Sequence, residues 1–209
     1  MPIHMQSHVR RVRFDLARLD RFAQAILSDV GETSAELGIL FVGDQRMRGL
    51  NRRYRGKDRT TDVLAFAMRE APTPHASRLT PRPLGDVVIS IPTAQRQARQ
   101  RGWSLDEEIT VLLVHGILHL CGYDHERSEK EARRMHRRER MILSRLAPLP
   151  KIAGCGETMS ARENCDGEHV WHNRRTLLQD AQKGQTSHPP NPGAPRRAAP
   201  RARPQRVKD

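Results

Sequence analysis

The sequence contains no apolar run of about 18 or more residues, the length that a helix needs to cross a bilayer, so no membrane span is expected. Residues 1–15 alternate between polar and apolar and therefore lack the apolar core of a signal peptide. Cysteine is also scarce. The chain has three, Cys121, Cys155 and Cys165, and an odd number with this spacing indicates no disulfide framework. Together these absences favour a protein of the reduced cytoplasm.

Acidic residues are too few to balance the basic ones. The chain has 37 Lys and Arg against 24 Asp and Glu, a formal net charge of +13. Residues 151–209 hold 11 basic and 6 acidic residues, and the remaining 26 and 18 leave the first part at +8. The surplus is therefore not confined to the tail, and it favours a nucleic acid as partner, through contacts to phosphate. The alternative is that an arginine-rich composition only improves solubility.

The spacing of apolar residues predicts one α+β domain over residues 1–149. Strands are predicted at residues 9–14, 35–42, 61–66 and 84–90, with a proline-rich loop at 69–83. Two helices are predicted from their apolar spacing and end signals, at residues 16–30 and 92–102. Three more are predicted to begin at N-cap residues, which are Asp44, Ser104 and Ser128.

Residues 150–209 are predicted to be a basic tail rich in Pro and Arg. From Pro189 onward this composition cannot bury enough apolar surface to offset chain entropy, so disorder is expected. Cys155, Cys165, His169 and His172 could suggest a second zinc site, but their spacing fits no strong template. The tail is expected to add non-specific affinity for phosphate.

The segment from His115 to His125 reads His-Gly-Ile-Leu-His-Leu-Cys-Gly-Tyr-Asp-His, with histidines at relative positions 0, 4 and 10. His115 and His119 share one face of a helix because side chains four residues apart stack along the axis. Gly122 can end that helix through a left-handed turn, which would swing His125 back toward the first pair. Three converging imidazoles with no fourth ligand predict a catalytic zinc site with an open position.

One departure from the extended zinc-protease motif restricts the chemistry. A zinc protease has Glu immediately after the first His, as the general base for water. Here that position is Gly116, which cannot move a proton. The metal ligands are thus kept and the peptidase base is missing, which makes a metallopeptidase the less favoured function.

Three motifs together resemble the YbeY family, bacterial rRNA maturation factors regarded as metal-dependent endoribonucleases. They are the histidine segment, Asn51-x-x-Tyr-Arg-x-Lys-Asp58 followed by Thr61-Asp-Val-Leu, and Leu84-Gly-Asp-Val, and they occur in family order. The resemblance covers roughly residues 9–146. It implies a small α+β fold, in which helices pack on a mixed four-stranded sheet and one helix carries the metal ligands as in zinc proteases. Ala65 and Ala67 depart from the Ser and Pro usual in the family strand.

The resemblance also implies a chemistry. It assigns one zinc ion to His115, His119 and His125, and places Arg55 in the metal cleft as the functionally important arginine. The implied activity is single-strand-specific, zinc-dependent RNA cleavage in 16S rRNA maturation at the 3′ end and in ribosome quality control. Its partners would be rRNA and ribosomal subunits, with ribosomal proteins and assembly GTPases as further candidates. The competing hypothesis is an RNA-binding ribosome-assembly factor whose zinc is mainly structural.

Several individual roles stay open at this level. A guanidinium at Arg55 can make forked contacts to phosphate and stabilise charge in a transition state, or it can be a surface residue of a turn. Lys57 could contact phosphate or be a solvated turn lysine. Asp124, beside a ligand, could orient an imidazole or cap the turn. Glu126 is a weaker candidate base, and Asp86 is placed near the cleft by its motif but is expected to be structural.

Overall fold

The computed structural model describes residues 2–68 and 82–155, which form five helices and six strands. The strands are β1 (Ile3–Ser7), β2 (Val12–Phe14), β3 (Ala35–Val42), β4 (Val63–Ala67), β5 (Arg82–Ser90) and β6 (Ala153–Cys155). The helices are α1 (Leu16–Val30), α2 (Asp44–Arg55), α3 (Ile91–Arg101), α4 (Leu105–Leu120) and α5 (Glu129–Arg145).

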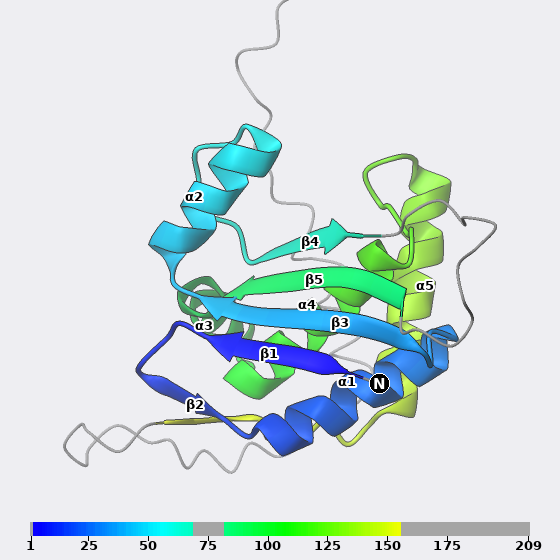
Figure 1. The fold of residues 1–209 in the computed structure, drawn as a ribbon, viewed down its shortest axis with the longest axis horizontal. Helices are drawn as coiled ribbons and strands as arrows, with labels where there is room; N and C mark the ends of the chain where they lie inside the picture. The colour runs from blue at the N-terminus through cyan, green and yellow to red at the C-terminus, as the bar shows by residue number, and fades with distance from the viewer. Residues whose placement is uncertain (1, 69–81, 156–209) are drawn as a thin grey trace, which may run out of the picture.

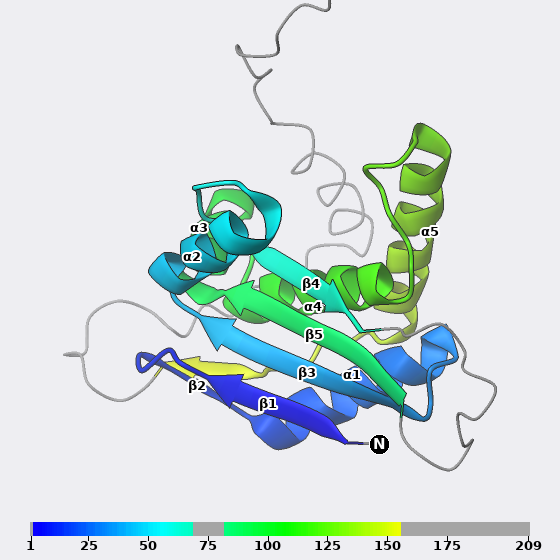
Figure 2. The ribbon, with the colours of Figure 1, turned by 45° about the horizontal axis from the view of Figure 1, so that its top comes forward.

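The main sheet has four strands in the order β1-β3-β5-β4 (Figure 1). Strands β1, β3 and β5 are parallel, and β4 is antiparallel to β5. The predicted α+β fold with a mixed four-stranded sheet is therefore confirmed. Strands β2 and β6 form a second, antiparallel pair, which Figure 2 shows beside β1.

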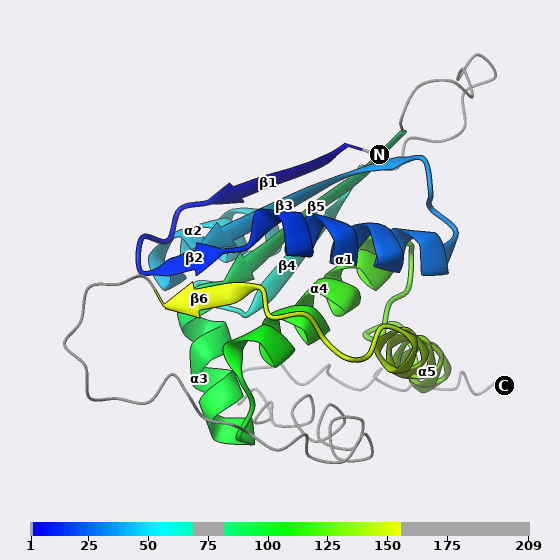
Figure 3. The ribbon, with the colours of Figure 1, turned by 90° about the horizontal axis from the view of Figure 1, so that it is seen from below.

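The two faces of the main sheet are covered unequally. Helices α1, α3, α4 and α5 and the β2–β6 pair all lie on one side, as the view in Figure 3 shows. The larger apolar core is on this side and includes Leu37, Val87 and Ile89 from the strands. On the opposite face, a smaller cluster around Met47 and Val88 joins α2 to the sheet.

Helix α4 is the central element of the larger core. Every residue from Glu108 to Leu118 is buried, which is typical of a helix that packs on all sides. Its first turn is fixed by a capping box: the Ser104 hydroxyl accepts from the Glu107 backbone N–H, and the Glu107 carboxylate accepts from the Ser104 backbone N–H. The cap predicted at Ser104 is confirmed. A helix held in this way is a rigid base for the side chains near its C-terminal end.

Most of the predicted elements are present, and the largest differences lie at the two ends of the domain. The cap of α2 is Gly43 and not Asp44, which is the first residue of the helix. Helices α1, α3 and α5 and strand β3 match the predicted ranges closely. The strand expected at residues 9–14 is only three residues long, and β1, which was not predicted, forms the edge of the main sheet. An edge strand needs apolar residues on one face only, and β1 alternates weakly between Ile3 and Met5 and polar neighbours. Within the described residues, none of the helices combines the length and apolar character needed to cross a membrane.

The fold continues beyond the boundary expected near Leu149. Ile152 is buried at 1% exposure, and β6 pairs with β2. The backbone N–H groups of Ile152 and Ala153 both donate to Oδ1 of Asp106, at 2.7 and 2.6 Å. Residues 150–155 thus close the base of the domain over the start of α4. Residues 82 and 83, which were predicted to end the proline-rich loop at 69–83, belong to β5 instead. Residues 69–81 and the tail from residue 156, with Cys165, His169 and His172, lie outside the described residues.

A chain that ends at Leu149 should be less stable than one that ends at Cys155. It would lose the buried Ile152 side chain and leave the Asp106 carboxylate without its two backbone donors, a loss of roughly 2–4 kcal/mol. Urea unfolding of the two chains would measure the difference. Equal midpoints and slopes would show that residues 150–155 do not contribute to the domain.

Candidate metal centre

Helix α4 presents His115 and His119 from consecutive turns of its C-terminal half. Their Nε2 atoms are 3.1 Å apart, and the ring centroids are 4.7 Å apart. His115 is buried at 8% exposure, whereas His119 is half-buried. The i, i+4 spacing in the sequence therefore brings two imidazoles together on one helix face.

The third histidine returns to this pair through the turn after α4. Gly122 has φ +89°, a left-handed conformation that costs glycine little. The N–H of Gly122 donates to His119 O and that of Tyr123 to Leu118 O, which reverses the chain direction. The His125 ring consequently lies 5.2 Å from that of His115 and 5.1 Å from that of His119, centroid to centroid.

One nitrogen from each of the three histidines lies within 4.8 Å of the others, so the group could hold a metal ion. Tetrahedral zinc with nitrogen ligands at about 2.0–2.1 Å would separate two ligand atoms by about 3.3 Å. The 3.1 Å between Nε2 of His115 and Nε2 of His119 is close to that separation. A set of three neutral imidazoles leaves a fourth tetrahedral position for water or substrate.

The protein environment favours the neutral, metal-binding form of His119 and His125. Burial, and then the proximity of His115 and His125, lowers the pKa of His119 from 6.5 to about 4. Burial and His115 also lower the pKa of His125, although Glu126 and Asp124 oppose the shift. His119 and His125 therefore need not release protons before they bind a cation at neutral pH.

The free energy of unfolding of the metal-free protein should contain a His119 contribution that is lost as the pH falls from about 6.5 to about 4. Between these values the unfolded chain binds a proton that the folded chain does not, so this contribution rises with pH. Burial raises the pKa of Glu108 to about 7, which gives the opposite slope over part of the same range. The quantity to measure is therefore the difference between wild type and His119→Gln, by urea unfolding in chelator across this range. Parallel pH profiles for the two proteins would contradict the shifted pKa.

The structure explains why glycine follows the first histidine. A Cβ on Gly116 would lie 2.7 Å from Cγ1 of Val87 and 3.4 Å from Cγ2 of Val63. Gly116 thus faces the side chains of Val87 on β5 and Val63 on β4, and not the histidine cluster. A glutamate at this position would have to displace the Val87 side chain, so the packing here disfavours the peptidase base as well.

Arg55 reaches the edge of the histidine cluster from a distant part of the chain. It is the last residue of α2, and its Nη2 lies 3.1 Å from Oε2 of Glu126, the residue after His125. Both side chains are exposed, at 46% and 57%. Lys57 lies on the exposed turn after α2, where its backbone contacts Asn51 and Arg59. The structure therefore brings Arg55 to the histidine loop, and no contact to that loop is seen for Lys57 within the described residues.

Asp124 is engaged in the turn that carries His125. Its Oδ1 accepts from the backbone N–H of Glu126 at 2.9 Å, and its Oδ2 is 4.0 Å from Nε of Arg127. These contacts agree with the turn-capping alternative for Asp124, and its charge acts on the histidines only through space. The residue that contacts a histidine directly is Glu139 on α5, whose Oε1 is 3.4 Å from Nδ1 of His115. The signal for Glu139 in the sequence is its position on the apolar stripe of α5, between Met135 and Ile142.

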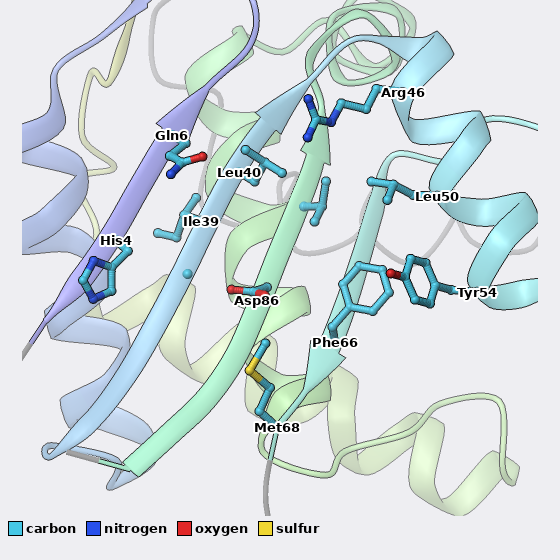
Figure 4. Close-up of a pocket in the computed structure, with 12 residues that line it drawn as sticks. His4, Gln6, Ile39, Leu40, Arg46, Leu50, Tyr54, Phe66, Met68 and Asp86 are labelled. Carbon is cyan, nitrogen blue, oxygen red and sulfur yellow. The ribbon is translucent and has the colours of Figure 1, made fainter. Parts of the chain in front are cut away.

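A separate groove of about 500 Å³ lies on the sheet face opposite α4. Asp86 lines this groove together with His4 and Tyr54 (Figure 4). The carboxylate of Asp86 lies over Gly38, where an added Cβ would collide with Oδ1. The exposed Tyr54, edge-on to Phe66, forms the side nearest α2. The structural role expected for Asp86 fits this position, whereas its proximity to the metal cleft does not.

Comparisons with known proteins identify the family of this chain. The family model described as Endoribonuclease YbeY matches residues 4–147. A relative from Aquifex aeolicus named Endoribonuclease YbeY is 44% identical over 138 residues, which cover 66% of this chain and 87% of that protein. One of the same name from Geobacter metallireducens is 44% identical over 145 residues, covering 69% and 95%. A solution structure from Thermotoga maritima aligns with a TM-score of 0.47 at 17% identity, covering 92% of this chain and 99% of that one. By the family model and by these relatives, the chain belongs to the YbeY family of endoribonucleases.

Proposed function

We propose that this endoribonuclease cuts single-stranded RNA with one zinc ion held by His115, His119 and His125, in the 3′ end maturation of 16S rRNA and in ribosome quality control. The observation that carries the proposal is the convergence of three imidazole nitrogens within 4.8 Å. A cytoplasmic location and contacts with ribosomal subunits, ribosomal proteins and assembly GTPases belong to the same proposal.

The protein's own residues would divide the work around the ion. When bound, zinc supplies Lewis acidity toward water and a phosphate oxygen. His115 and His119 would hold it from a rigid helix and His125 from the loop that follows, and burial favours the neutral form of His119 and His125. Arg55, at the rim, would bind and neutralise the scissile phosphate through its forked N–H groups. Lys57 would give weaker, longer-range attraction to the RNA backbone.

The rival function is an RNA-binding assembly factor in which the metal is mainly structural. It is supported by the net charge of +13 and by the absence of a carboxylate at Gly116. Against it stands the exposure of the centre: His119 and His125 are only half-buried, and the ligand set leaves a position open. A structural zinc site is usually closed by a fourth protein ligand.

Metal removal separates the two functions. After treatment with chelator, cleavage of a single-stranded rRNA fragment should be lost, and stoichiometric zinc should restore it. A duplex of the same sequence is the matched substrate control, and it should be cut much more slowly in every state. Circular dichroism and RNA binding should change little, because α4 is held by its apolar core and not by the metal. Cleavage that persists in the metal-free protein would reject the metal mechanism, whereas loss of the fold with the metal would favour the structural role.

A further inference from the structure

Glu139 is a buried acid whose Oε1 has no hydrogen-bond partner among the residues that the structure describes. It lies on α5 at 3% exposure. The nearest donor is Nδ1 of His115, 3.4 Å away, which is itself buried and also without a hydrogen-bond partner. Two orphaned polar atoms thus face each other between α4 and α5.

The packing of α5 does not account for an acid at this position. The other buried side chains of the helix are apolar: Met135, Ile142 and Leu143. A carboxylate among them is costly to bury unless it is paired, and an aliphatic residue of similar volume would pack as well. The ion pairs that the α5 arginines make go to Glu129, Glu131 and Asp29, not to Glu139. The presence of an acid at this buried position is therefore explained by its contact with His115.

The two nitrogens of His115 face different partners. Its Nε2 points toward His119, 3.1 Å from the Nε2 of that ring, and so belongs to the metal-binding cluster. Its Nδ1 points away from the cluster, toward Glu139. A neutral imidazole carries one proton, and its partner decides which nitrogen keeps it.

We infer that Glu139 is a positioning residue of the centre: its carboxylate accepts the Nδ1–H of His115 and leaves the Nε2 lone pair free for the metal. The inference rests on the proposed zinc site and goes beyond it. It makes zinc binding by His115 on α4 depend on the packing of α5, which carries Glu139. The negative charge of the Glu139 carboxylate also strengthens the donation of the His115 Nε2 lone pair to the metal, and it partly offsets the charge of the ion. Nδ1 and Oε1 need to approach by only a few tenths of an ångström to form a good hydrogen bond.

Zinc affinity is the first measurement, by competition with a chromophoric chelator. Glu139→Gln and Glu139→Leu should bind zinc about 10- to 100-fold more weakly than wild type. Glu129→Gln removes the same charge from an exposed site on the same helix and should bind like wild type. The metal-free Glu139→Leu protein should melt at the same or a higher temperature, because the cost of burying a carboxylate is removed together with its single hydrogen bond to His115. A merely structural glutamate would give the opposite result, a lower melting temperature with zinc affinity falling only as the fold is lost.

The tautomer of His115 gives a second, metal-free measurement. In ¹⁵N-labelled apoprotein, the His115 ring should carry its proton on Nδ1 in wild type and lose this preference in Glu139→Leu. An Nε2–H ring in wild type, or variants that bind zinc within about twofold of wild type, would overturn the inference. If wild type itself bound no zinc at the histidines, the proposed function would fail, and the tautomer would still report on Glu139.

Discussion

Replacing His119 by alanine should abolish stoichiometric zinc binding and lower the rate of RNA cleavage at least about 10³-fold. Metal catalysis supplies several kcal/mol of transition-state stabilisation, and each 1.4 kcal/mol corresponds to a factor of ten in rate. Two remaining imidazoles make an incomplete tetrahedral set, so affinity and activity should fall together. Zinc titration and single-turnover cleavage of a single-stranded rRNA fragment would measure the two effects.

His119 is a better choice than His115 because the two histidines differ in burial. His115 is at 8% exposure within the core of α4, so its replacement would also leave a cavity. His119 is half-buried, and its lowered pKa means that removing it should not destabilise the folded metal-free protein at mildly acidic pH. His4→Ala is the matched control. His4 lies on β1, away from the histidine cluster, and contacts Glu36 on β3 at 2.7 Å. Its replacement should leave cleavage unchanged. A His119→Ala protein that binds zinc as wild type does would remove His119 from the centre.

Local sequence patterns predict the parts of the site that lie within one short segment. The three histidines and Gly122 span eleven residues, and helical periodicity with one left-handed turn is sufficient to bring them together. Caps at Ser104 and Ser128 follow from side chains that accept backbone N–H groups three residues ahead. These interactions are local, so the remainder of the fold hardly affects them.

Contacts between distant segments were not predictable in the same way. Glu139 is one of many charged residues in a helix full of arginines, and only the docking of α5 on α4 shows that it is buried against His115. Glu108 stands among the acids of the first turn of α4, and the local pattern does not show that it is buried against Arg101, with the two side chains 2.7 Å apart. Strand β6 depends on pairing with β2, more than a hundred residues earlier in the chain. Such positions are set by tertiary packing, which overrides the local pattern.

Arg55 and Glu126 form an ion pair that substrate can replace. The two side chains are 46% and 57% exposed, and exposed pairs of this kind contribute about 1 kcal/mol or less. A phosphate with two charged oxygens offers the guanidinium a stronger, forked partner than one carboxylate oxygen at 3.1 Å. The position of Arg55 is itself fixed, because Gly56 ends α2 in a left-handed cap with φ +68°. Glu126 would thus hold the arginine near the histidines in the free enzyme and release it to RNA.

Replacing Arg55 by alanine should therefore lower kcat/KM for RNA cleavage by about 10²- to 10³-fold, with zinc affinity unchanged. Arg55→Lys should recover only part of this loss, because an ammonium keeps the charge but not the fork. Arg53→Ala is the matched control and should cost little, because Arg53 lies two residues earlier on the same helix and stacks on Tyr54. Glu126→Gln separates two roles: activity should be kept or raised if Glu126 only holds Arg55, and lost if it carries the proton. If Arg55→Ala cleaves RNA as fast as Arg53→Ala, the guanidinium makes no special contact with phosphate, and the centre must neutralise the scissile group by other means.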